Sequence, residues 1–165
     1  MTRRSRIAIG ILGFFAVMLI VFGVTDVLGG VVSDPGITVA ISGRAPADVQ
    51  AQDPAGYRLY DFTTRALGLA LVVMGALLAS IVLVPYRAGQ RWSWATLWAL
   101  PAWAVAVPAL YLTFGVAPGA PPAPPMVSAP VIAALAAGAL LVDRRRFAAR
   151  SAADGSLAFG RVGAG

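Results

Sequence analysis

The sequence predicts an all-α protein: a bundle of four transmembrane helices with both termini in the cytoplasm. Composition is the first observation, because hydrophobic residues make up 59% of the 165-residue chain and charged residues only 12%. Soluble domains are about 25% charged. The mean hydropathy of +0.79 agrees with a membrane protein. The other two observations are the spacing of the apolar residues and the distribution of the arginines.

Four apolar spans are expected as membrane helices, at about residues 7–32, 66–85, 92–116 and 126–142. A hydrocarbon core about 30 Å thick needs roughly 20 helical residues, and each span is near that length. The spans must be helices, because lipid offers the backbone no hydrogen-bond partner and four spans cannot close a barrel. We therefore predict one membrane domain, residues 1–147, and a disordered cytoplasmic tail, residues 148–165, rich in Ala, Gly and Ser.

The first span begins like a signal peptide, with arginines before an apolar run. A signal core is about 7–15 residues long and is followed by a small-residue cleavage site. Here the apolar run extends from Ile7 to Val24, and no good A-x-A site follows directly. We therefore expect a retained helix.

The arginines predict the orientation, because cytoplasmic flanks of membrane helices carry an excess of Lys and Arg. The residues expected near the cytoplasmic face are Arg3, Arg4, Arg6, Arg87, Arg91, Arg144, Arg145, Arg146 and Arg150. Only Arg44, Arg58 and Arg65 are expected on the other side. This asymmetry predicts a multi-pass protein of the plasma membrane with both ends inside.

The segment 33–62 is expected to be a partly structured outer loop of about 30 residues, a length uncommon for a loop without structure or a role. Within it, "ITVAIS" is a candidate short strand. The stretch "APADVQAQ" is a candidate short helix, because Pro46 suits a first helical turn. The Pro-rich loop "APGAPPAPPM" is expected to be an extended strap between two helices.

A candidate polar cluster lies at the outer ends of the first two helices, formed by Asp26, Asp61 and Arg65. Intramembrane acids are costly and indicate function when a partner is at hand, here Arg65. Asp61 and Arg65 also have the i, i+4 spacing of a helical ion pair. The cluster predicts either a structural clamp, which we favour, or a small site for an ion, a headgroup or a proton.

Aromatic and basic residues gather where the second helix turns into the third. They are Tyr86, Arg87, Arg91, Trp92, Trp94 and Trp98. Trp and Tyr prefer the headgroup level, and arginines reach the phosphates there. We expect these residues to anchor the hairpin at the interface, with a headgroup pocket as the alternative.

The third span contains Pro101 and Pro108, seven residues apart on roughly one face. Proline removes a backbone donor and presses on the carbonyl four residues earlier, so we expect a bend. Trp103 lies between them, deeper than the interface, and is a candidate binding residue. In the second span, Gly68 and Gly75 predict close helix contacts, within the bundle rather than in a homodimer.

The stretch "TTRALGLALVVMGALL", followed by "YRAGQRWSWATLWALP", resembles a pattern in small four-helix integral membrane proteins of actinobacteria. The resemblance covers about residues 60–103. In that pattern the inner hairpin reads Arg, Gly, any residue, Arg, Trp, small, Trp. The resemblance implies a membrane location and topology and assigns no catalytic or binding residue.

The chain has no Cys, His, Glu or Lys, so it lacks the commonest general bases and metal ligands. We therefore expect no catalytic residue, metal or cofactor, and no nucleic-acid binding, because the arginines flank apolar runs. The leading hypothesis is a non-enzymatic accessory or structural protein acting through membrane lipids, other membrane proteins or self-association. The alternatives are a small lipid or lipophilic-molecule binder or transporter, and an enzyme on a lipid substrate.

Overall fold

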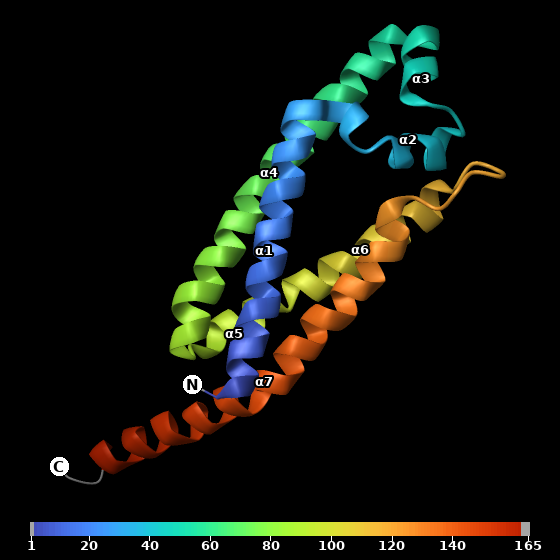
Figure 1. Cartoon of the computed structure of the whole chain (residues 1–165). Coiled ribbons are helices and arrows are strands. Elements are labelled where there is room, and N and C mark those ends of the chain that lie inside the picture. Colours follow the sequence, from blue (N-terminus) through green and yellow to red (C-terminus); the bar gives the residue numbers. More distant parts are fainter. Residues whose placement is uncertain (1, 163–165) are drawn as a thin grey trace.

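The computed structural model describes residues 2–162, and the side chains of residues 2–148; these residues form helices and loops without a strand (Figure 1). Four helical spans in this part are long and apolar enough to cross a membrane: Arg3–Ser33, Pro54–Tyr86, Arg91–Phe114 and Pro124–Ala148. Many of their large apolar side chains are exposed, such as Leu112 at 75% and Phe114 at 79%. Such surface favours lipid over water. The predicted all-α class with four candidate membrane spans is confirmed.

Helix α1 (Arg3–Gly29) begins earlier than predicted because Thr2 caps it. The Thr2 hydroxyl accepts a 3.2 Å hydrogen bond from the amide of Ser5, one of the unpaired donors of a helix start. The helix is capped by Gly30, whose φ of 60° suits glycine, and a 3-10 turn spans Gly30–Ser33.

The segment after α1 is helical, which corrects the candidate strand "ITVAIS". Helix α2 (Pro35–Ser42) has proline in its first turn and ends at Gly43, whose φ is 71°. These start and stop signals outweigh the β-branched residues between them. Helix α3 (Pro46–Gln52) forms where the sequence predicts a short helix, with Pro46 in its first turn.

Helix α4 (Pro54–Ile81) begins well before the predicted residue 66. Asp53 caps it by accepting a 2.9 Å hydrogen bond from the amide of Gly56, and Pro54 occupies the first turn. The helix packs along α1 (Figure 1). A methyl group on Gly68 would lie 2.7 Å from the Gly23 carbonyl oxygen. Close contact within the bundle therefore requires glycine, as the sequence predicts.

The third span is divided, where the sequence predicts one helix. After a π-helical turn at Val82–Tyr86, helix α5 (Arg91–Leu97) ends at Trp98 and helix α6 (Ala99–Phe114) begins. Pro101 explains this break, because its ring presses on the carbonyl of Leu97, where α5 ends. Within the first turn of α6, the missing amide hydrogen of Pro101 costs little.

Helix α7 (Pro124–Val162) is longer than the predicted helix 126–142. It starts with prolines, which suit a first helical turn. The sequence predicts a disordered tail at residues 148–165. Residues 148–162 belong to this helix, and residues 163–165 lie outside the described part of the chain. The disorder of that tail stays a prediction.

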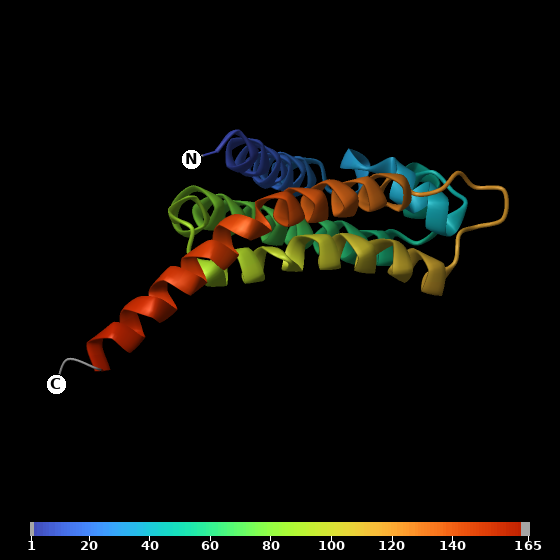
Figure 2. The ribbon, with the colours of Figure 1, turned by 90° about the horizontal axis from the view of Figure 1, so that it is seen from below.

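The helices form two hairpins, α1 with α4 and α6 with α7, which join where α1 contacts α7. The N-terminus, α5 and the C-terminal part of α7 lie at one end, which we call the arginine-rich end (Figures 1 and 2). Helices α2 and α3 and the loop before α7 lie at the other, the loop end. The buried core lies toward the arginine-rich end and includes Leu12, Phe15, Val82, Leu140 and Phe147.

Candidate functional site

Arg65 and Asp61 meet at the loop end, on the first part of α4. The guanidinium Nε lies 2.8 Å from Oδ2 of Asp61. Arg65 also donates to the carbonyl oxygens of Val27 and Leu28, at 2.7 and 3.0 Å, while Asp61 accepts from the Val31 amide at 3.0 Å. The pair therefore provides hydrogen-bond partners for backbone groups at the end of α1 that the helix itself leaves unpaired. This geometry agrees with the hypothesis of a structural clamp between α1 and α4.

Asp26, the third member of the predicted cluster, has a different partner. Its Oδ1 accepts a 2.8 Å hydrogen bond from the hydroxyl of Ser33. Among the described residues, no ion pair joins Asp26 to Arg65. Of the two acids that the sequence offers as partners of Arg65, the structure pairs it with its i, i+4 neighbour Asp61 and not with Asp26.

A pocket of about 210 Å³ lies beside Asp26 at the loop end, where α6 approaches the first hairpin. Its polar lining consists of Asp26, Asp34, Tyr60, Thr63, Thr64 and Tyr111, and its apolar lining of Val31, Ile37 and Leu67. The Thr63 and Thr64 hydroxyls bond to carbonyls of their own helix. The carboxylates of Asp26 and Asp34 give the pocket a negative charge.

At the arginine-rich end, Asp143 is only 3% exposed. Its Oδ1 accepts a 2.6 Å hydrogen bond from the Ser5 hydroxyl, and Oδ2 lies 3.5 Å from Nη1 of Arg146. Arg146 also donates to the Arg87 carbonyl oxygen. The buried Tyr86 hydroxyl lies near Asp143 without a well-aligned hydrogen-bond partner among the described atoms. This cluster joins α1, α7 and the α4–α5 turn.

The predicted interface anchors divide into exposed and buried residues. Arg87, Arg91 and Trp92 are exposed, and the Trp92 ring nitrogen donates to the Gln90 side chain at 2.7 Å. Tyr86, however, has no exposed surface. Its ring packs 5.0 Å from that of Phe147, because the π-helical turn directs it into the bundle.

The tryptophans that follow are partly buried against the core. Trp94 and Trp98 contact edge to face, with ring centroids 5.9 Å apart, as expected for i, i+4 neighbours. The Trp94 ring nitrogen donates to the Leu140 carbonyl oxygen at 3.0 Å. Trp94 therefore connects α5 to α7, and Trp98 packs against Trp94.

The residues proposed around the bend do not line the loop-end pocket. Pro101 is buried, Pro108 is partly buried, and Trp103 packs against the core. The pocket instead uses Tyr111, one turn after Pro108. Pro101, Trp103 and Pro108 therefore do not contribute to the loop-end pocket.

The fold defines a helical protein with four candidate membrane spans, and the described side chains hold no group of three or more His, Cys, Asp or Glu residues able to bind a metal. Comparison with known proteins gives no match: no family model matches the chain, and neither curated proteins nor solved structures match it. The function must therefore be argued from the sites themselves.

The sequence pattern did not single out Asp143, nor any polar residue of the pocket other than Asp26. Asp143 follows the apolar stretch of α7 and precedes three arginines, a pattern typical of a solvated helix end. Its signal was the single acid in an otherwise basic flank. Tyr111 had a clearer signal, because a tyrosine inside an apolar span needs a polar partner.

Proposed function

We propose that the protein is a non-enzymatic plasma-membrane protein that binds a small lipid or lipophilic molecule in the loop-end pocket. The carrying observation is that one pocket combines carboxylates, tyrosines and apolar side chains from α1, α2, α4 and α6. Binding sites are typically concave and largely apolar, with a few polar groups that fix orientation. An amphiphile fits such a lining better than a wholly polar or wholly apolar molecule does.

The proposed ligand places its polar group in the pocket and its apolar part against lipid-facing surface. The pocket volume of about 210 Å³ suits a headgroup or another compact polar group. Leu67 in the lining and Leu112 on α6 are 58% and 75% exposed, so an apolar chain has surface to follow. The carboxylates of Asp26 and Asp34 favour a ligand without net negative charge.

We propose an orientation with the arginine-rich end in the cytoplasm and the loop end outside. The N-terminus, the α4–α5 turn and the Arg144–Arg146 run share one end of the bundle (Figure 1). An excess of arginine at one end is the positive-inside pattern. The pocket then faces the outer leaflet, and the resemblance to actinobacterial membrane proteins agrees with a bacterial plasma membrane.

Lipid mass spectrometry of protein purified in mild detergent tests this function. We expect a lipophilic molecule to co-purify with the wild type and to be lost from Thr64→Phe, which fills the pocket. Thr113→Phe is the matched control, because Thr113 is exposed on α6 and its hydroxyl also bonds only a carbonyl of its own helix. Equal lipid content in all three proteins would contradict binding in the pocket and favour an accessory role through partner proteins.

A further inference from the structure

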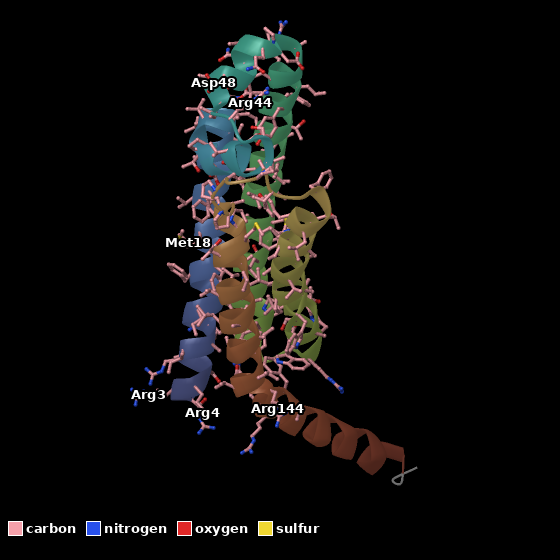
Figure 3. All side chains as sticks on the ribbon, turned by 90° about the vertical axis from the view of Figure 1, so that its right-hand side faces the viewer. Arg3, Arg4, Met18, Arg44, Asp48 and Arg144 are labelled. Carbon is pink, nitrogen blue, oxygen red and sulfur yellow. The ribbon has the colours of Figure 1, made fainter. Side chains whose placement is uncertain are left out.

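Arginines from the first and last membrane helices converge on a shallow cavity at the arginine-rich end. Arg4 of α1 and Arg144 and Arg145 of α7 line it, over a floor of Leu141 and Val142. The cavity volume is about 760 Å³. Figure 3 shows Arg4 and Arg144 at the same end of the bundle, extending beyond the ribbon of their helices.

Among the side chains that the structure describes, no acid forms an ion pair with these arginines. The ion pairs found among the described side chains involve Arg65 and Arg146, and neither includes an arginine of the cavity. The nearest acid in sequence, Asp143, is buried and already bonded to Ser5 and Arg146. The N-terminus of α1 adds the positive end of its dipole. The cavity therefore favours an anion.

An apolar stripe on α7 leads away from the cavity toward the loop end. Val131, Leu135, Gly138 and Val142 follow i, i+4, i+7, i+11 spacing and therefore share one face. The three large residues are about half exposed: Val131 56%, Leu135 49% and Val142 52%. A methyl group on Gly138 would meet nothing within 4 Å, so the stripe is open there.

The length of this stripe matches one leaflet. Eleven residues of helix rise about 16 Å, and half of a hydrocarbon core is about 15 Å. The guanidinium groups at one end complement the phosphate of a phospholipid, and the apolar stripe matches the length of its acyl chain within one leaflet. A soluble phosphate would use the arginines and leave the track without a role.

We infer that the cavity and the α7 stripe form a binding site for an anionic phospholipid, with its phosphate held by Arg4, Arg144 and Arg145. Arginine suits this role because its planar donors bind phosphate oxygens in pairs. The acyl chain lies along Val131, Leu135 and Val142 beside Gly138. This site is separate from the loop-end pocket, at the opposite end of the bundle, and does not depend on the function proposed for that pocket.

Native mass spectrometry of the full chain tests the site. The protein is held in dodecyl maltoside micelles with equal amounts of dioleoyl phosphatidylglycerol and dioleoyl phosphatidylcholine. We expect the wild type to retain phosphatidylglycerol preferentially. In the variant R144Q/R145Q the ratio of retained phosphatidylglycerol to phosphatidylcholine falls about fivefold for each arginine removed. Ser5, Asp143 and Arg146 are unchanged in this variant, so the buried cluster is preserved.

The control variant R44Q/R58Q removes the same charge at the loop end, where both arginines are exposed. It should retain the wild-type lipid ratio, because binding at a local site depends on the arginines of that site. General electrostatic attraction of anionic lipid would depend only on the net charge of the protein. Equal losses in both double variants would overturn the proposal. Displacement of the lipid by inorganic phosphate, with phosphate itself retained by the protein, would also overturn it and identify a soluble anion as the ligand.

Discussion

The Ser5 hydroxyl donates a 2.6 Å hydrogen bond to Oδ1 of Asp143 and joins α1 to α7 across 138 residues of sequence. Both side chains are almost completely buried, at 1% and 3% exposure. A charge-assisted hydrogen bond is stronger where water is excluded. Arg146 lies on the other carboxylate oxygen at 3.5 Å, so the acid is paired rather than isolated. The bond holds α1 against α7 at the arginine-rich end of the bundle, where the two hairpins meet.

Loss of this bond should destabilise the bundle. We expect Ser5→Ala to lower the free energy of unfolding by about 1.5–3 kcal/mol, the range for hydrogen bonds to charged groups. Asp143→Asn should have a comparable effect, and the double variant should cost less than the sum. The measurement is SDS-induced unfolding in mild detergent, followed by tryptophan fluorescence. Thr113→Ala is the exposed control, and additive single effects would show that the two residues do not interact.

The pairing at the loop end gives a prediction that separates Asp61 from Asp26. Arg65→Ala and Asp61→Ala should couple by about 0.5 kcal/mol, because the pair is partly exposed and helical i, i+4 pairs are weak. Arg65→Ala and Asp26→Asn should be additive within about 0.3 kcal/mol, since Asp26 bonds Ser33 instead. Double-mutant cycles on unfolding measure both values. A larger coupling of Arg65 to Asp26 would contradict the arrangement described for the loop end.

The contact between α1 and α4 predicts that alanine substitutions at two glycines of α1, Gly23 and Gly10, have different effects on stability. A methyl group on Gly23 would lie 2.5 Å from the Gly68 carbonyl oxygen, and backbone cannot move aside as a side chain can. We expect Gly23→Ala to cost about 1–3 kcal/mol, the usual penalty for overpacking. Gly10→Ala meets nothing within 4 Å and should be neutral or stabilising by up to about 1 kcal/mol. Thermal unfolding of both variants provides the comparison, and equal destabilisation would refute the close contact.

The sequence predicts the helical class and the four spans well, because hydropathy over about 20 residues records the requirement that lipid imposes on each span. Helix ends are predicted less well. The start of α4 depends on capping by Asp53 and Pro54, twelve residues before the apolar run begins. Pro101 predicts only a bend in the third span, whereas the structure divides this span at Trp98.

The side-chain clusters are harder to predict because they depend on which helices become neighbours. Asp61 and Arg65 could be paired from their spacing within one helix. The Ser5–Asp143 bond could not, since nothing local links the first and last helices. The same limit applies to the pocket, whose lining comes from separate elements and includes Tyr60 and Tyr111.

The orientation that we propose can be tested because the chain has no native cysteine to confuse labelling. Gln50→Cys on α3 and Ala88→Cys in the α4–α5 turn introduce thiols at opposite ends, and both positions are exposed. Because the arginines of the turn should lie on the cytoplasmic side, α3 should lie outside. A membrane-impermeant maleimide should therefore label Gln50→Cys in intact cells. It should label Ala88→Cys only after permeabilisation. The cysteine-free parent chain is the control for nonspecific labelling, and the reverse pattern would show that the arginine-rich end faces outward.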